Sequence, residues 1–237
     1  MDEISIAKLT ELSNSGVIAT LGGGGFLMEP RNRRLDNWLL SLTRKRRPRV
    51  LFLPTASGDA ARYVARFHRA FPSGAHLGLF NRTVRDLRSF VLRHDVVYVG
   101  GGNTANMLAV WRVHGLDAIL KEACDNGTLL CGVSAGANCW FENSLTDSFG
   151  RPLRPLDDGL GLLPGSFCPH YDGERDRRAA YRRFVANGAL PEGWAAEDSV
   201  AVLWRGGQVA EIVASRRGKS AWRVSRDAEQ RYSAAML

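Results

Sequence analysis

Long hydrophobic runs are absent from this chain of 237 residues. No stretch approaches the roughly 18 apolar residues that a membrane-spanning helix requires. The first twenty residues also lack the basic and then apolar order of a secretory signal, and they contain Asp2, Glu3 and Glu11. We therefore expect neither a membrane partner nor a secretory leader, and we expect a cytoplasmic location.

Cysteine is scarce as well. The four cysteines, Cys124, Cys131, Cys139 and Cys168, form no C-x-x-C pair. This spacing argues against a disulfide framework and against a zinc site. We predict reduced, mostly buried thiols, with no metal and no organic cofactor.

Lysine is almost missing, although the formal net charge is +8. Lys8, Lys45, Lys121 and Lys219 are the only lysines, so arginine supplies most of the positive charge. The arginines are spread over several clusters, and no nucleic-acid-binding motif accompanies them. We therefore expect no nucleic-acid partner.

Short apolar runs alternate with amphipathic segments along the first half of the chain. Continuous apolar strands of this kind are typical of a parallel sheet that helices cover on both faces. Hydrophobic residues make up 45% of the chain, which suits one folded domain over residues 1–237. We expect strands at residues 17–21, 50–54, 75–79, 96–99 and 128–131, and helices at residues 30–43, 60–71, 104–113 and 116–126.

Toward the C-terminus the pattern changes to that of a β-hairpin. Two apolar runs, at residues 199–204 and 209–213, flank the pair Gly206-Gly207, which is typical of a two-residue hairpin turn. The predicted fold class is therefore α/β, with a mostly parallel sheet, helices on both faces and a C-terminal β-hairpin.

Three glycine-rich turns follow predicted strands, at residues 22–25, 100–102 and 132–136. Ligands of open α/β sheets bind outside the carboxyl ends of the strands, so these turns can meet at one crevice. The first turn lacks the G-x-G-x-x-G order of a dinucleotide loop, and no Gly-Lys-Ser/Thr follows it. A nucleotide site is therefore not favoured.

The third of these turns has the form of a nucleophile elbow, in which a sharp turn from strand to helix exposes a serine. Ser134 follows an apolar run and is flanked by Gly132, Ala135 and Gly136, which are small enough for such a turn. An ordinary strand-to-helix turn would look similar. A catalytic role for Ser134 therefore requires a base and an acid elsewhere in the chain.

His170 is the best candidate for the base among the five histidines. It follows an apolar segment, and Pro169 restricts the backbone just before it. Glu197 and Asp198 are candidates for the acid, because they precede the predicted strand at residues 199–204. The order serine, histidine, acid differs from the order in α/β-hydrolases, which argues against an esterase or lipase of that fold.

Three segments together resemble the peptidase E family, which includes aspartyl dipeptidases and the related cyanophycinases. They occur in the order and at the spacing of that family, and they cover roughly residues 96–213. The segments are the glycine-rich loop Val99-Gly100-Gly101-Gly102-Asn103-Thr104, the elbow Gly132-Val133-Ser134-Ala135-Gly136-Ala137-Asn138, and the histidine segment Cys168-Pro169-His170-Tyr171.

The resemblance implies a flavodoxin-like or class I glutamine-amidotransferase-like sheet that carries a Ser-His-acid triad. It implies that Ser134 is the nucleophile and His170 the base, with an oxyanion hole formed by the backbone amides of Gly101 and Ala135. The family's acid precedes a strand, and counting back from the turn at residues 206–208 favours Asp198, with Glu197 one residue away. Only one of the two should face His170, because side chains alternate at a strand entrance.

The segment after His170 is similar to the family's Gly-Glu…Arg…Arg stretch. Arg175 and Arg178 are spaced like residues one helical turn apart, and an arginine pair suits the capture of a substrate carboxylate. A solvated helix face is the alternative interpretation.

The expected activity is that of a serine exopeptidase acting on short peptides, above all an aspartyl (Asp-X) dipeptidase. A general dipeptidase, a carboxypeptidase-like exopeptidase, a cyanophycinase-like hydrolase and a non-catalytic binding protein are alternatives. A glutamine amidotransferase would require cysteine at position 134. The short peptide substrate is the expected partner, and a homodimer is left open.

Overall fold

The structure is a computed structural model that describes residues 16–237. Most of the segment on which the prediction about a secretory leader depends, residues 1–20, lies outside the described residues. Within residues 16–237, no helix has both the length and the apolar character needed to cross a membrane.

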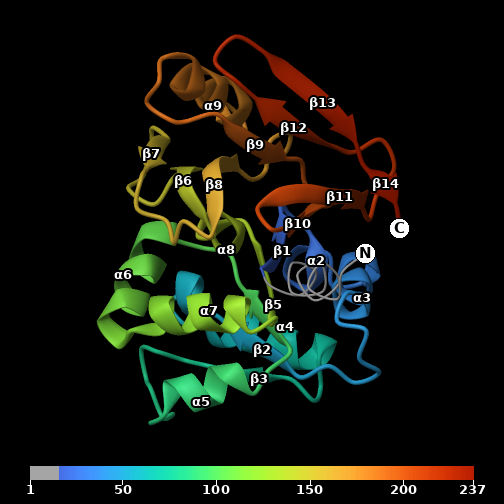
Figure 1. Cartoon of the computed structure of the whole chain (residues 1–237), viewed down its shortest axis with the longest axis vertical. Coiled ribbons are helices and arrows are strands. Elements are labelled where there is room, and N and C mark those ends of the chain that lie inside the picture. Colours follow the sequence, from blue (N-terminus) through green and yellow to red (C-terminus); the bar gives the residue numbers. More distant parts are fainter. Residues whose placement is uncertain (1–15) are drawn as a thin grey trace, which may run out of the picture.

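A first sheet of eight strands has the order β14-β11-β10-β1-β5-β4-β2-β3 (Figure 1). The neighbours from β1 to β3 in this order are all parallel, as predicted, and β10 is antiparallel to β1. The strands are β1 (Val17–Leu21), β2 (Val50–Leu53), β3 (Ala75–His76), β4 (Val96–Val99), β5 (Leu129–Val133), β10 (Val200–Arg205), β11 (Gln208–Ala214) and β14 (Ala235–Met236).

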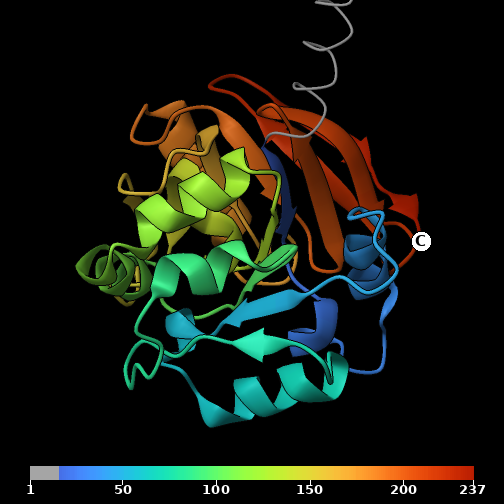
Figure 2. The same ribbon diagram turned by 60° about the horizontal axis from the view of Figure 1, so that its bottom comes forward.

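Both faces of the parallel strands are apolar, because successive side chains of a strand point to opposite faces. In β4, Val97 and Val99 belong to one buried cluster, and Val96 and Tyr98 belong to another. Helices cover both faces, as Figure 2 shows for the blue-to-green half of the chain. One face carries α5 (Leu87–Leu92), α6 (Thr104–His114) and α7 (Leu116–Asp125), and the other carries α2 (Gly25–Met28), α3 (Arg34–Ser41) and α4 (Ala61–Ala70).

The predicted C-terminal hairpin is present as β10 and β11. Arg205 pairs with Gln208 across a turn in which Gly206 has φ 55° and Gly207 has φ 76°. Two successive positive φ angles suit the right-handed twist of the strands, and only glycine adopts them without strain.

A second sheet of six strands, in the order β13-β12-β9-β8-β6-β7, was not predicted from the sequence. Two of its strands are poor in strand-forming residues: β8 contains Pro164 and Gly165, and β9 contains only Gly193, Trp194 and two alanines. One buried cluster extends from the first sheet into the second. The strands are β6 (Phe141–Thr146), β7 (Arg154–Leu156), β8 (Leu163–Cys168), β9 (Gly193–Ala196), β12 (Ser220–Val224) and β13 (Glu229–Ser233).

Two short elements and one longer helix complete the described chain. The short helix α8 (Ala135–Asn138) follows β5, and the 3₁₀ turn η1 (Thr55–Ser57) follows β2. Helix α9 (Arg177–Ala186) lies between β8 and β9 in the sequence.

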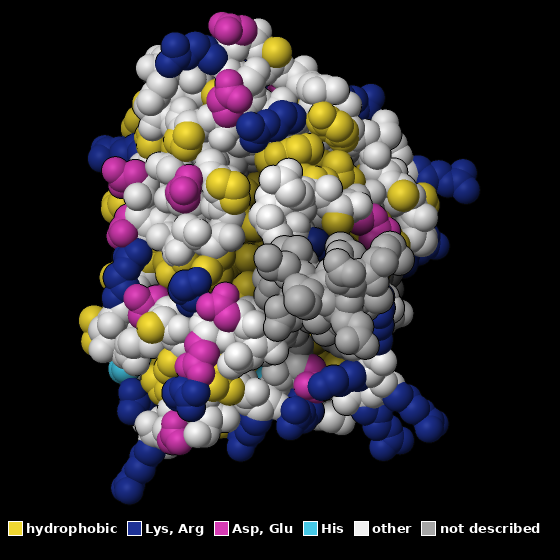
Figure 3. All heavy atoms as spheres, in the orientation of Figure 1, with side chains coloured by type: hydrophobic (Ala, Val, Ile, Leu, Met, Phe, Trp, Pro, Cys, Tyr) yellow, Lys and Arg dark blue, Asp and Glu magenta, His cyan; other side chains and the backbone are white. Residues whose placement is uncertain are grey.

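The basic side chains do not form one patch on the face shown in Figure 3, where they lie both at the edges and within the view, with acidic side chains among them. Several arginines are paired with carboxylates, including Arg112 with Asp158 at 2.6 Å. All four cysteines are free and buried, which confirms the prediction of buried thiols.

Candidate active site

The turn after β1 joins three segments that are far apart in the sequence. Three consecutive carbonyls of this turn accept backbone hydrogen bonds: Leu21 from Ser134 at 3.2 Å, Gly22 from His170 at 3.1 Å, and Gly23 from Ser199 at 3.1 Å. Because consecutive Cα atoms are only about 3.8 Å apart, these bonds gather the serine, the histidine and the acid-bearing turn at one place. From the sequence, this glycine turn was expected to meet the other two glycine-rich turns at one crevice, but its backbone bonds to the three segments were not predicted.

Ser134 lies between β5 and α8 in a strained backbone conformation, with φ 57° and ψ −115°. Non-glycine residues rarely adopt such angles, which are typical of a nucleophile elbow. The elbow requires its small neighbours: a side chain on Gly132 would overlap the backbone of Gly136, and one on Gly136 would overlap the backbone of Val99. The sequence therefore builds a tight turn that presents Ser134 at the end of the sheet.

The glycine-rich loop after β4 packs against the serine. A Cβ added to Gly101 would lie 3.3 Å from Ser134 Cβ and 3.8 Å from Ser134 Oγ. Gly102 has φ 142° and lies so close to the Ala56 carbonyl that no side chain would fit. Among residues 16–237, no hydrogen-bond acceptor is assigned to the backbone amides of Gly101 and Ala135. Gly101 therefore lies beside Ser134 in space, and Ala135 follows Ser134 in the chain.

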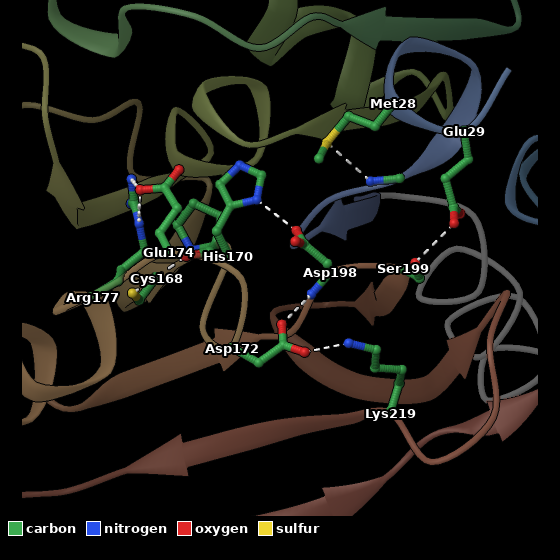
Figure 4. Close-up of polar contacts among 12 residues, drawn as sticks. Met28, Glu29, Cys168, His170, Asp172, Glu174, Arg177, Asp198, Ser199 and Lys219 are labelled. Atoms are coloured by element: carbon green, nitrogen blue, oxygen red, sulfur yellow. Dashed lines mark hydrogen bonds and ion pairs between the residues drawn. The ribbon is translucent and has the colours of Figure 1, made fainter.

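His170 and Asp198 form a direct pair, in which His170 Nδ1 and Asp198 Oδ1 are 2.6 Å apart (Figure 4). His170 follows β8 and has φ 54°, while Asp198 lies in the turn between β9 and β10. The His170 side chain is 9% exposed and that of Asp198 is 31% exposed. Partial burial would raise the pKa of Asp198, but the hydrogen bond to His170 and the charges of Lys219 and Arg177 keep this pKa below its usual value.

Two glycines enclose the Asp198 carboxylate. A Cβ added to Gly23 would overlap Asp198 Oδ1, and a Cβ added to Gly173 would overlap Asp198 Oδ2. Neither glycine has a positive φ, so their requirement is one of space rather than of backbone conformation. The carboxylate therefore has one narrow position, in which it faces His170.

Replacing Gly23 with Ala should displace the Asp198 carboxylate, because the added methyl group would also lie 3.1 Å from His170 Nδ1. We expect kcat/KM for peptide hydrolysis to fall about 10²-fold, which is typical of an ångström-scale misplacement of a catalytic group. Gly78→Ala is the matched control, since that glycine also has an ordinary φ and its added Cβ only approaches Asp59 at 3.1 Å. A folded Gly23→Ala protein with full activity would contradict the expected role of this glycine.

Glu197 faces away from the histidine. It is 9% exposed, and its carboxylate accepts hydrogen bonds from the Ser220 amide at 3.1 Å and from Trp222 Nε1 at 2.9 Å. The neighbouring residue Asp198 points the opposite way, as expected at a strand entrance. Of the two acidic candidates, the structure thus brings Asp198 to His170 and attaches Glu197 to β12.

The expectation that Arg175 and Arg178 lie one turn apart on a helix is wrong. Helix α9 begins only at Arg177, because Asp176 has φ 68° and breaks the helical path. The Arg175 side chain is 95% exposed, and Arg178 pairs with Glu229 at 2.7 Å. The two guanidinium groups therefore do not form a common carboxylate site.

The buried arginine of this segment is instead Arg177, whose side chain is 3% exposed. It donates two hydrogen bonds to Glu174 Oε2, at 2.8 Å from Nε and 2.6 Å from Nη2. Figure 4 shows this pair beside His170. Glu174 precedes helix α9, and the Arg177 amide donates to the Glu174 carbonyl at 3.3 Å, so a turn rather than a helix brings the pair together and helical spacing in the sequence gives no signal for it.

Comparisons with known proteins agree with this arrangement. The model of Peptidase family S51 matches residues 18–212. An uncharacterized peptidase of Bacillus subtilis, YgaJ, is 51% identical over 211 residues, which cover 87% of this chain and 91% of that protein. Peptidase E of Streptomyces coelicolor is 34% identical over 128 residues, about half of either chain (52% and 51%).

A solved structure shows a similar fold. The crystal structure of a peptidase from an acI-B1 Actinobacterium has a TM-score of 0.65 and 17% sequence identity, and the match covers 93% of this chain and 95% of that one. The family model and the Bacillus relative confirm the family that the three sequence segments indicated. This chain belongs to peptidase family S51.

Proposed function

We propose that this protein is a serine exopeptidase that hydrolyses dipeptides with an N-terminal aspartate through an acyl-enzyme. One observation carries the proposal: a single turn after β1 holds the backbone of the strained Ser134 and that of His170, and His170 is paired with Asp198. A nucleophile, a base and an acid in this relation are the parts that covalent catalysis of acyl transfer requires. Membership of a peptidase family supports peptide-bond hydrolysis as the reaction.

The proposed reaction follows from the roles of these groups. Asp198 accepts the hydrogen bond from His170 Nδ1, so Nε2 takes the proton from Ser134 Oγ as that oxygen attacks the scissile carbonyl. The amides of Gly101 and Ala135 stabilise the oxyanion of the tetrahedral intermediate. His170 then passes the proton to the leaving amine, the C–N bond breaks, and water attacks the acyl-enzyme to release the acid and restore Ser134.

The preference for aspartate depends on the resemblance to aspartyl dipeptidases, because the buried Arg177 is already paired with Glu174. A general dipeptidase is the second candidate, and a specific observation favours it: Arg178, one of the two expected carboxylate ligands, is paired with Glu229, and Arg175 extends into solvent.

A set of dipeptides tests the proposal. We expect Asp-X to be hydrolysed at least 10²-fold faster, in kcat/KM, than Asn-X or Ala-X, because a site that pairs with a substrate carboxylate leaves its own polar groups unpaired when a neutral analogue binds. N-acetyl-Asp-X should be a poor substrate of an exopeptidase. Equal rates for Asp-X and Ala-X would establish the general dipeptidase instead, and no hydrolysis of any dipeptide would overturn both candidates.

We also propose a cytoplasmic location. Its support is that Cys124, Cys131, Cys139 and Cys168 are all free thiols, as is usual in a reducing compartment.

A further inference from the structure

The backbone amide of Asp198 is held by a second carboxylate. Asp172, two residues after His170, accepts the Asp198 N–H through Oδ1 at 2.8 Å. Its other oxygen, Oδ2, is paired with the ammonium group of Lys219 (Figure 4). Asp172 therefore bridges the triad acid and a lysine from a distant part of the chain.

We propose that Asp172 and Lys219 form a positioning pair that fixes Asp198 opposite His170; this inference rests on the proposed function. The pair acts on the backbone amide of Asp198, the residue whose carboxylate is also enclosed by Gly23 and Gly173. Asp198 is followed by Ser199, which has φ 68° and is held through its hydroxyl by Glu29 at 3.1 Å. The Asp198 amide and the Ser199 hydroxyl are thus both held by hydrogen bonds. These bonds restrain the backbone on either side of the Asp198 side chain and keep its carboxylate opposite His170.

The same contact also positions a wall of the carboxylate site. Asp172 directly precedes Gly173, where an added Cβ would overlap Asp198 Oδ2. Movement of Asp172 would therefore shift both the amide of Asp198 and the surface on which its carboxylate rests.

Without a partner, Asp172 would add a negative charge beside the His170–Asp198 pair. Lys219 offsets that charge. The Lys219 side chain is 24% exposed and that of Asp172 is 32% exposed, so the two charges meet in a partly desolvated place. Besides His170 and Lys219, Arg177 also acts on Asp198, and Arg177 is paired with Glu174. Lys219 thus compensates the charge of the carboxylate that does the positioning.

Lys219 lies outside the segment that the family model matches, which ends at residue 212. It directly precedes β12, and its carbonyl accepts a hydrogen bond from Ala234 after β13 at 3.0 Å. The hairpin of β12 and β13 therefore carries a side chain to the active site. This gives the C-terminal part of the chain a role in the reaction in addition to its role in the second sheet.

Charge-changing variants of the full-length protein test the pair, with the pH profile of kcat/KM as the readout. In Lys219→Met, the uncompensated Asp172 charge favours protonation of the His170–Asp198 pair, so the acid limb should move to higher pH by about half a unit. In Asp172→Asn, the uncompensated lysine opposes protonation, so the limb should move to lower pH by a similar amount. The double variant should return it to the wild-type position.

We expect kcat to fall about tenfold in Lys219→Met with little change in KM, and Lys219→Arg to recover most of the loss. Lys121→Met is the matched control, because Lys121 also pairs with an aspartate, Asp125, but on the exposed surface of α7. If the variants shift the acid limb no more than Lys121→Met does, while the wild type is active, the positioning role is wrong. An inactive wild type that fails to react with a fluorophosphonate would instead overturn the proposed function.

Discussion

Replacing Ser134 with Ala is expected to abolish peptide hydrolysis, lowering kcat by about 10⁴- to 10⁶-fold, while leaving the fold intact. Alanine is no larger than serine, and the turn already accommodates a Cβ at φ 57°. The loss should be this large because, in the proposed mechanism, the hydroxyl forms the acyl-enzyme and the remaining site can only bind and polarise the substrate.

Covalent labelling tests the reactivity of Ser134 without a peptide substrate. A fluorophosphonate should modify wild-type protein at one site and should not modify Ser134→Ala. Ser144→Ala is a suitable control, because Ser144 is a buried serine of β6. Labelling that persists in Ser134→Ala would assign the reactive serine to another position.

Asp198→Asn should lower kcat about 10⁴-fold, whereas Glu197→Gln should change it less than threefold. The asparagine keeps the shape of the side chain, but it does not bear the negative charge that stabilises the imidazolium, and it favours the wrong tautomer of His170. Glu197 lies next to Asp198 in the sequence, but it contacts Ser220 and Trp222 of β12. The two variants therefore separate an effect on the histidine from a general effect on the turn.

The comparison requires that both proteins be folded. Glu197 is buried and accepts two hydrogen bonds, so its replacement should lower the thermal unfolding temperature, which should be measured beside kcat for each variant. A large loss of kcat in well-folded Glu197→Gln, with activity retained in Asp198→Asn, would exchange the roles of the two acids.

The parallel half of the fold was predictable from local patterns. Apolar runs such as Val96–Val99 have both faces buried, so their hydrophobicity is continuous and visible in the sequence. The second sheet was not predictable in this way. Its strands β8 and β9 contain proline, glycine and alanine, and they are strands because they pair with each other and with segments such as β12 and β6.

The candidate site was also predictable only in part. Ser134 and His170 are marked in the sequence by their small or rigid neighbours, Gly132, Gly136 and Pro169. The arginines were misjudged because the spacing of Arg175 and Arg178 suggests a helix, while the positive φ of Asp176 starts that helix later. Because of this one backbone angle, the arginine whose side chain is buried is Arg177, and not Arg175 or Arg178.

The sequence by itself determined the family, the parallel core, the elbow at Ser134 and its likeness to a serine peptidase, because these depend on neighbouring residues and on ordered motifs. Only the tertiary structure decided that Asp198 rather than Glu197 meets His170, and that Gly23, Asp172 and Lys219 surround the acid. These contacts join residues up to 175 positions apart, as between Gly23 and Asp198. Local pattern carries no information about such contacts, since chain folding alone brings the residues together.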